Sequence, residues 1–415
     1  MKTGTFASID VGTSKICTIL ANVDDSGGMR VLGVGVAPAR GLHKGVVVDI
    51  EKTKEAIRES AALAERTCGA KIESAYVGIT GRHVGSLNNS GMVAIRRSDR
   101  LVTQKELNRV LSNARTIKVP SDRKLLHVIP RGYQVDGQAG VTNPEGMHGF
   151  RLDVETHIVT AAGTSIQNLV KCIRGAGIEV DDLVLEPLAS AEAVLTPDEM
   201  QNGAILADIG CGTTDVAVFK DGSIWHTAIL PVGGYQFTRD ITMGLGVPYG
   251  VAEELKIKYG NVKPDSDRLE DTIDTSKWGL DTGNGNSIVR EDICEIVQAR
   301  AEELLKMIVV EMAPSGDSEA LTPQTLVLTG GAANLSGLAA RAQEIFRIPA
   351  RVGAPKGMYG LADILFNPAY ATSVGLLLWG SKHGPEQNWR QGRHWENFGG
   401  AVRRLLFRMK RVLPN

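Results

Sequence analysis

Cysteine is scarce in this chain, and its spacing excludes two common uses of the residue. The 415 residues include five cysteines, none of them in a CxxC pair: Cys17, Cys68, Cys172, Cys211 and Cys294. An odd, scattered set of thiols does not make a disulfide framework, and it supplies no paired ligands for a zinc ribbon. We therefore expect a protein of a reducing cytoplasm.

Long apolar runs are missing as well. No stretch approaches the roughly 18 uncharged apolar residues that indicate a membrane-spanning helix. The first residues, MKTGTFASIDVG, lead directly into a strand-like pattern and contain no hydrophobic signal core. The sequence predicts neither a secretory leader nor a transmembrane helix.

A strong overall charge is also absent. The formal net charge is −1, with 43% apolar and 22% charged residues. This composition is typical of soluble globular proteins and excludes low-complexity disorder. At roughly 150 residues per domain, the length predicts about two to four domains. The charge is nevertheless polarised, because residues 395–415 contain five basic residues and one acidic residue, which leaves −5 for the rest of the chain.

Two segments, residues 6–36 and 204–234, repeat the same pattern. Each has an apolar strand that ends in aspartate, a turn of small residues, a second strand, a glycine-centred turn and a third strand. The interval between them is too long for a solenoid repeat. We therefore expect an α/β protein with two homologous domains that face each other.

Between and after these repeats the pattern changes. A helix is expected at 51–67 and a returning strand at 75–80. Residues 83–163 have signals of their own, including the capping-box pair Thr103 and Glu106 at the start of a helix, and we predict that this block is an inserted α+β subdomain. A polar excursion at 261–290 precedes a helix at 291–311, and residues 381–394 are expected to form a linker.

Each repeat carries a loop that suits a metal–phosphate site. Backbone N–H groups and hydroxyls bind phosphate oxygens, and an aspartate at the strand end recruits Mg²⁺ through water. One such loop alone is most often an ordinary hairpin turn. Two copies, with a third glycine-rich turn at 329–331, predict a nucleotide in a cleft between the domains, with Asp10 and Asp208 facing Mg²⁺. The first loop comprises Asp10, Gly12, Thr13, Ser14 and Lys15, and the second comprises Asp208, Gly210, Gly212, Thr213, Thr214 and Asp215.

These motifs carry a resemblance to a known family. DVGTSK and DIGCGTTD resemble the two phosphate motifs of the actin-like ATPase superfamily, and TGGAANLSGL is similar to its adenosine motif. Over nearly all of its length the chain resembles the FtsA family of bacterial cell-division proteins. The matching segments are YVGITGRHV, GMHGFRLDVETHIV, LEPLASAEAVL, PVGGYQFTRDITMGLGV and a basic amphipathic C-terminus. The resemblance implies an actin-like ATPase fold, with two related domains around a nucleotide cleft, an FtsA-type inserted subdomain and a C-terminal amphipathic helix.

The resemblance also implies a division of the chain. The first actin-like domain is expected at 1–82 and 164–200, with the inserted subdomain at 83–163. The second domain is expected at 201–238 and 315–380, with a subdomain of its own at 239–314. The linker at 381–394 then leads to a membrane-targeting helix at 395–415.

Further site residues follow from the resemblance. Glu186 matches the position that orients the attacking water, so that the catalytic set is Glu186, Asp208 and Asp10; alternatively, Glu186 only complements a helix dipole. The residues expected at the adenosine are Gly233, Gly234, Glu253, Lys256, Gly330, Gly331 and Ala332. Glu253 and Lys256 could instead be an exposed ion pair. Cys211 stands where another glycine is common, without an evident role.

The C-terminal segment has the pattern of an interfacial helix. On a helical wheel, a wide apolar face lies opposite a cationic face, an arrangement that lets apolar side chains enter a bilayer while Arg and Lys meet anionic lipid. The alternative is a terminal helix that docks on its own domain. The residues expected at the membrane are Trp395, Phe398, Val402, Arg403, Arg404, Leu405, Leu406, Arg408, Met409, Lys410, Arg411 and Leu413.

The resemblance implies an ATP-binding protein, with slow ATPase activity at best, that polymerises and tethers the FtsZ ring to the cytoplasmic face of the cell membrane at the division septum. Its expected partners are the FtsZ tail, further copies of itself, anionic lipid and, through the inserted subdomain, other division proteins, but not nucleic acid. Arg300 is the residue expected to hold the acidic FtsZ tail, unless it pairs with Glu303. The alternatives are a pilus-assembly protein with the same type of insert, an actin-like chaperone or, less favoured, a sugar kinase.

Overall fold

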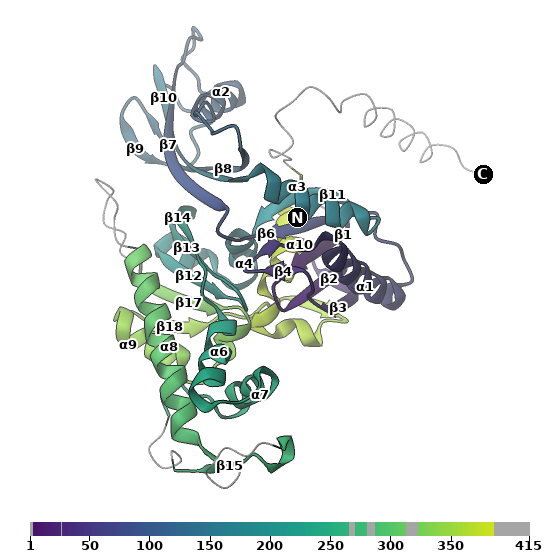
Figure 1. The fold of residues 1–415 in the computed structure, drawn as a ribbon. Helices are drawn as coiled ribbons and strands as arrows, with labels where there is room; N and C mark the ends of the chain where they lie inside the picture. Colours follow the sequence, from purple (N-terminus) through teal and green to yellow (C-terminus); the bar gives the residue numbers. More distant parts are fainter. Residues whose placement is uncertain (1–2, 26, 265–269, 280–286, 313–322, 386–415) are drawn as a thin grey trace, which may run out of the picture.

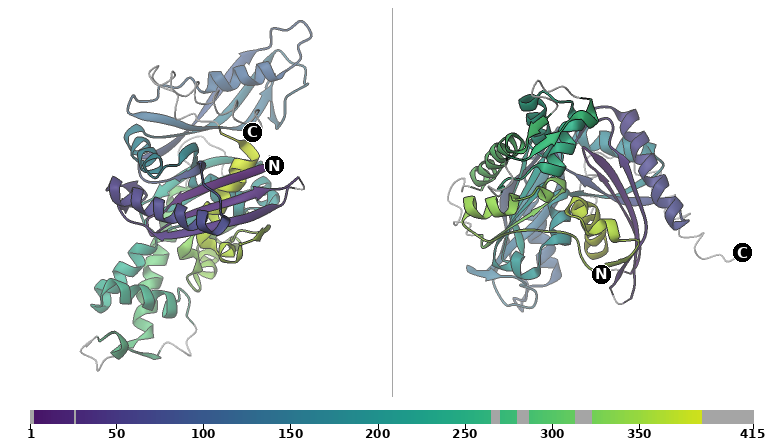
Figure 2. Two further views of the ribbon diagram at one scale, coloured as in Figure 1. Left: turned by 90° about the vertical axis from the view of Figure 1, so that its right-hand side faces the viewer. Right: turned by 90° about the horizontal axis from the view of Figure 1, so that it is seen from below.

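The computed structural model describes residues 3–25, 27–264, 270–279, 287–312 and 323–385 (Figure 1). Two lobes lie side by side, each built on its own sheet. A smaller sheet domain projects from one end, and a helical subdomain projects from the other (Figure 1; Figure 2, left). Most of the predicted linker and all of the expected membrane helix at 395–415 lie outside the described residues.

The first lobe is a six-stranded sheet in the order β11-β6-β1-β2-β3-β19. Strands β1, β2 and β3 form an antiparallel meander, whereas β6 and β11 run parallel to β1. Both faces are covered, by α1 and α3 on one side and by α4 and α10 on the other, which is why β1 and β2 are buried over most of their length. The elements are β1 Gly4–Val11, β2 Lys15–Val23, β3 Met29–Pro38, β4 Leu42–His43, β5 Val46–Val47, α1 Ile50–Cys68, β6 Ser74–Ile79, α3 Gly163–Gly175, β11 Glu179–Leu185, α4 Glu186–Val194, β19 Met358–Gly360 and α10 Ala371–His383.

The second lobe repeats this plan with a five-stranded sheet in the order β14-β13-β12-β17-β18. The antiparallel meander β12, β13 and β14 again continues into parallel strands, here β17 and β18, which confirms the repeated unit. The helical subdomain is built from α6, α7 and α8. The elements are α5 Pro197–Asn202, β12 Ala204–Ile209, β13 Thr214–Lys220, β14 Ser223–Leu230, α6 Gly234–Leu245, α7 Tyr249–Tyr259, β15 Thr272–Asp274, β16 Ser287–Val289, α8 Arg290–Glu311, β17 Thr325–Thr329, α9 Leu338–Phe346 and β18 Ala350–Val352, with 3₁₀ helices at Ser276–Trp278, Gly331–Asn334, Asp363–Phe366 and Pro368–Tyr370.

The insert leaves the first lobe after β6 and returns to it at α3. Its antiparallel sheet has the order β7-β10-β8-β9, and α2 covers one face over a small core of its own. The predicted capping box is present, since the Glu106 carboxylate accepts hydrogen bonds from the Thr103 backbone and hydroxyl. The elements are β7 Val84–Ala94, α2 Gln104–Ala114, β8 Arg123–Val135, β9 Gln138–Val141 and β10 Arg151–Ala162.

The end of the described chain corrects the predicted division. Residues 315–380 were expected in the second domain, but β19 pairs with β3 and α10 packs on β1, β2 and β6 of the first lobe. Helix α10 is buried on nearly all sides in the first lobe. Its Gly375 lies so close to Ala189 of α4 that no side chain would fit between the two helices. The helix also runs to His383, so the predicted linker does not begin at Ser381.

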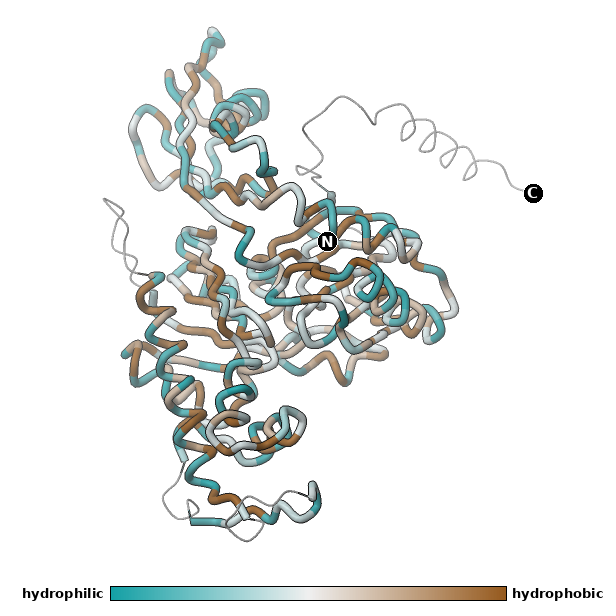
Figure 3. The backbone as a smooth tube through the Cα atoms, in the orientation of Figure 1, coloured by the Kyte–Doolittle hydropathy of each residue, from teal (hydrophilic) through white to brown (hydrophobic). Residues whose placement is uncertain are grey.

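Apolar residues are concentrated in the sheets and in the helices that cover them (Figure 3). No helix of the described residues is both long enough and apolar enough to cross a membrane.

Candidate functional site

The two predicted phosphate loops face each other across a cleft of about 590 Å³ between the lobes. They come close together, since a Cβ on Gly212 would lie 2.9 Å from the Thr13 hydroxyl and 3.0 Å from Lys44 Cα. Predicted residues that line the cleft are Asp10, Gly12, Thr13, Ser14, Lys15, Glu186, Asp208, Gly210, Gly212, Thr213, Asp215, Gly234, Glu253, Lys256, Gly330, Gly331 and Ala332.

Each loop is the tight turn of an antiparallel hairpin, β1–β2 or β12–β13. Gly12 is required in the first, because a Cβ there would lie 2.9 Å from the Lys15 carbonyl oxygen. In the second hairpin Asp208 is directly opposite Asp215. Asp10, Asp208 and Asp215 all line the cleft, beside the turns of the two hairpins.

Two predicted residues do not reach the cleft. Thr214 is fully buried and its hydroxyl donates to the Val232 carbonyl at 2.8 Å, so it is not available to a phosphate. Gly233 is buried behind the second loop, where a Cβ would lie 2.6 Å from the Gly210 carbonyl oxygen. Its role is to let α6 begin close to that loop.

Four carboxyl groups lie buried at the base of the cleft. Burial raises the pKa of Asp10 to about 6 and that of Asp215 to about 7, and it raises the pKa of Glu186 well above its ordinary value. Burial also raises the pKa of Asp208. Neighbouring carboxyl groups add to the raised pKa values of Asp10, Glu186 and Asp215, because negative charges that are close together oppose ionisation.

This charge arrangement fits a hydrated divalent cation, which would favour the ionised carboxylates. In the part of the chain that the structure describes, no group of three or more His, Cys, Asp or Glu side chains converges to ligate a metal directly. Mg²⁺ commonly keeps several of its waters and uses one or two carboxylates with phosphate oxygens. Asp10 and Asp208 both line the cleft and are the residues that would hold such a cation.

Hydroxyl groups that sequence reasoning missed hold these carboxylates. The Ser373 hydroxyl donates to Asp10 Oδ2 at 2.7 Å. Asp208 Oδ2 accepts from the hydroxyls of Ser190 and, at 3.0 Å, Thr372. In the sequence these residues are small polar residues near the start of two apolar helices, a signal that does not say which loop they touch.

Lys15 lies beside the acidic residues. Its ammonium donates to the Ala369 carbonyl at 2.7 Å and lies 3.5 Å from the centre of the Tyr370 ring. Burial lowers the pKa of Lys15, while Asp10 opposes that change. The first loop is thereby attached to the segment that precedes α10.

The opposite wall contains the Glu253–Lys256 pair. The Lys256 ammonium donates to Glu253 Oε2 at 2.7 Å, to the Thr238 hydroxyl at 2.9 Å and to the Gly234 carbonyl at 3.2 Å. The ion pair of the alternative interpretation is thus present, but it lies in the cleft and joins α6 to α7. Gly330, with φ of 85°, closes the third turn beside Asp208.

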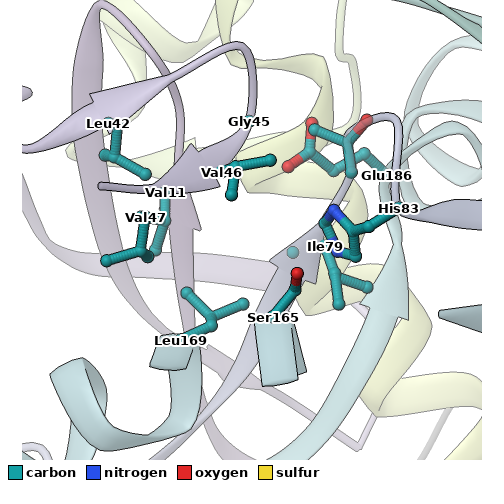
Figure 4. Close-up of a pocket in the computed structure, with 12 residues that line it drawn as sticks. Val11, Leu42, Gly45, Val46, Val47, Ile79, His83, Ser165, Leu169 and Glu186 are labelled. Atoms are coloured by element: carbon teal, nitrogen blue, oxygen red, sulfur yellow. The ribbon is translucent and has the colours of Figure 1, made fainter. Parts of the chain in front are cut away.

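Glu186 is the first residue of α4 and faces two spaces, the cleft and a small pocket behind it. In Figure 4 the side chains of Glu186 and His83 lie next to each other, with Leu42, Val46, Val47 and Leu169 on the other side of the pocket. Both ring nitrogens of His83 are buried without a hydrogen-bond partner among the described residues, and burial lowers its pKa to about 4. Because Glu186 is the first residue of α4, its position is also compatible with the alternative role, in which it only complements the helix dipole.

Arg300 does not lie in the cleft. It lies on α8, where it donates to Asp240 Oδ2 at 2.5 Å and to the Glu303 carboxylate. Its charge is therefore satisfied within the chain, in the way that the alternative interpretation described.

Comparison with known proteins identifies relatives along the chain. The family model "Cell division protein FtsA" matches residues 205–375, and the model "SHS2 domain inserted in FTSA" matches residues 81–160. Cell division protein FtsA of Pseudomonas aeruginosa is 43% identical over 90% of this chain and 88% of its own length. The Neisseria meningitidis protein of the same name is 38% identical over 98% of this chain and 97% of its own.

Solved structures share the fold. A chain of the PilM-PilN type IV pilus biogenesis complex matches with a TM-score of 0.62 and 17% identity, over 91% of this chain and 98% of its own. MreB5 of Spiroplasma citri bound to ADP matches with a TM-score of 0.52 and 15% identity, over 91% of this chain and 95% of its own. At these identities the matches show a shared fold and nothing more.

Proposed function

The chain belongs to the FtsA family of actin-like cell-division proteins, and from this membership we propose that it binds ATP with Mg²⁺ in the interlobe cleft. The observation that carries the proposal is the pair of phosphate loops that face each other there, each at the end of an equivalent hairpin. The glycine-rich third turn and the Glu253–Lys256 wall leave room for the adenosine.

The chain's own residues have distinct parts in this proposal. Backbone N–H groups and hydroxyls of the two loops bind the phosphates, and Asp10 and Asp208 hold the metal through water. When bound, Mg²⁺ neutralises negative charge on the phosphate oxygens. Glu186 orients the attacking water; burial and the neighbouring carboxyl groups raise its pKa well above the ordinary value, which favours its protonated form. We expect turnover to be slow, since the nucleotide controls assembly.

A blocking substitution tests the site. Gly331→Val should abolish ATP binding in a calorimetric titration with Mg²⁺, because the valine side chain would enter the cleft. A Cβ at position 331 would lie 3.8 Å from Ala369 Cβ, an ordinary van der Waals distance. The protein should stay folded, whereas Gly212→Val would also push against Thr13 and Lys44. The matched control is Glu186→Gln, which adds no bulk and should bind ATP like the wild type but lose its slow hydrolysis. Equal binding by Gly331→Val would place the nucleotide elsewhere.

We propose that residues 395–415 attach the protein to anionic membrane at the division septum, on its cytoplasmic face. Burying a Leu or Phe side chain is worth roughly 1.5–3 kcal/mol and each cation near an anionic surface about 1 kcal/mol, so apolar insertion should dominate. Leu405→Glu with Leu406→Glu should release the full chain from sedimenting anionic vesicles. Arg403→Ala with Arg404→Ala should weaken binding mainly at low salt. Undiminished sedimentation of the double-Glu variant would favour the docked-helix alternative.

We further propose that the protein polymerises, binds the FtsZ tail through its second lobe and meets other division proteins through the insert. Family membership supports these partners. The pilus-assembly alternative is less well supported, because the pilus-complex chain is 17% identical, against 38–43% for the two FtsA proteins.

A further inference from the structure

Helix α10 contacts the metal-facing carboxylates of both phosphate loops with two consecutive residues of its first turn. Thr372 donates to Asp208, which lies on β12 of the second lobe, and Ser373 donates to Asp10, which lies on β1 of the first lobe. The two aspartates come from segments about 200 residues apart in the chain. One helix end therefore connects two loops that share no backbone hydrogen bonds.

The surroundings keep these hydroxyls in place. Ser373 is fully buried and Thr372 is 8% exposed. The Ser373 carbonyl accepts from the Ser8 hydroxyl at 2.8 Å, which fixes the helix start to β1. The Thr372 hydroxyl also lies 2.9 Å from that of Ser190 on α4, the second donor to Asp208. Gly375 packs so closely on Ala189 that a Cβ there would lie 1.8 Å from the Ala189 carbonyl oxygen, so α10 and α4 are in direct backbone contact.

The contacts also orient the carboxyl groups. In both aspartates Oδ2 accepts the hydrogen bond from the hydroxyl of α10. The other oxygen, Oδ1, lies beside a glycine of the cleft, which is Gly12 for Asp10 and Gly330 for Asp208. A carboxylate with one oxygen fixed can present the other in a constant direction, which is what an octahedral cation with few protein ligands requires.

We propose that Thr372 and Ser373 are positioning residues that hold Asp208 and Asp10 in a fixed relation across the two lobes, and that this relation sets the affinity for the divalent cation accompanying the nucleotide. The inference rests on the proposed ATP site and adds the part of the chain that preorganises it. Ser373 does not line the cleft, and Thr372 lines it with its hydroxyl directed to Asp208, so that each residue acts through an aspartate.

The test is the Mg²⁺ dependence of ATP affinity in the full chain. Thr372→Val and Ser373→Ala each remove one hydroxyl, and Thr372→Ser keeps it. Ser381→Ala is the matched control, since Ser381 is a buried serine of the same helix whose hydroxyl donates to the Leu378 carbonyl within α10. ATP affinity is measured by calorimetry with Mg²⁺ and with EDTA, and thermal unfolding without ligand is recorded for every variant.

We expect Thr372→Val and Ser373→Ala to weaken ATP binding in Mg²⁺ about tenfold, the size of effect that losing a hydrogen bond to a charged group produces. Binding in EDTA should be unchanged, and Thr372→Ser and Ser381→Ala should behave like the wild type. Equal losses with and without Mg²⁺, or wild-type binding by both variants, would overturn the positioning role while leaving the ATP site intact. A wild-type chain that binds no ATP would instead overturn the proposed function itself.

Discussion

Asp10, Glu186, Asp208 and Asp215 place four carboxyl groups in one buried region, with Lys15 beside them. Isolated buried carboxylates are costly, so such a cluster is retained where a cation or a proton compensates for it. Asp10 and Asp208 could be predicted because each lies near the end of a strand in a repeated motif. Their partners Ser190, Thr372 and Ser373 could not, because a hydroxyl in an apolar helix has no sequence pattern that points to a distant loop.

Arg300 is best tested with a neutral substitution. Arg300→Glu would add a third carboxylate to Asp240 and Glu303, so lost binding could reflect damage to the contact between α6 and α8. Arg300→Gln should weaken binding of an FtsZ-tail peptide about tenfold if the arginine pairs with it, and it should also lower stability, because the Arg300–Asp240 pair is partly buried. Calorimetry measures the first effect and thermal unfolding the second. Unchanged peptide affinity would remove Arg300 from the interface.

At the scale of elements, the insert also touches the second lobe. The ring of His157 on β10 lies 3.0 Å from the Thr227 hydroxyl of β14 and 2.8 Å from Asn88 Oδ1 of β7. Hydrogen bonds from Ser86 to the Thr227 carbonyl and from Ser223 to the Pro130 carbonyl lie in the same contact. The insert therefore bridges the two lobes at the end of the molecule away from the helical subdomain (Figure 1).

Acid should weaken this contact. Burial, with His226, Arg131 and His127 acting in the same direction, lowers the pKa of His157 to about 3. Because the folded value is below the ordinary one, the stabilisation is complete above about pH 6.5 and is lost as the pH falls from there towards about 3.

The check is thermal unfolding between about pH 6.5 and pH 4.5, a range within that window. His157→Gln keeps hydrogen-bonding groups but cannot titrate, so it should make the acid side of the stability profile less steep. The slope should not vanish, because burial also lowers the pKa of His83 and of His127. His148→Gln, at an exposed position of the same subdomain, is the control and should keep the wild-type slope. Equal slopes for His157→Gln and the wild type would refute the assignment.

The elements with strong local signals were predicted well. The capping box at Thr103 and Glu106 and the two hairpin repeats are present in the structure. The return of β19 and α10 to the first lobe was not predicted, because it depends on pairing with β3 and packing on α4, far away in the sequence. The sequence of an apolar helix indicates that the helix is buried, but it does not indicate which sheet the helix packs against.

On the scale of the whole molecule, two lobes of the same plan meet at a cleft, and elements from both ends of the chain hold its base. Strand β1 is the first element of the described residues and α10 is the last. The two are nevertheless joined, because Ser373 of α10 donates a hydrogen bond to Asp10 of β1. A nucleotide that draws the loops together would therefore act on α10, on the lobes and, through β14, on the insert.

Protection of Cys211 from alkylation tests the central claim, that ATP occupies this cleft, most directly. Cys211 lines the cleft within the second phosphate loop, whereas Cys68 lies at the end of α1 and does not line the cleft; both are partly exposed. The account predicts that Mg²⁺ and ATP together slow the labelling of Cys211, followed by mass spectrometry, and leave the labelling of Cys68 unchanged. Identical labelling rates for Cys211 with and without saturating Mg²⁺–ATP would contradict it.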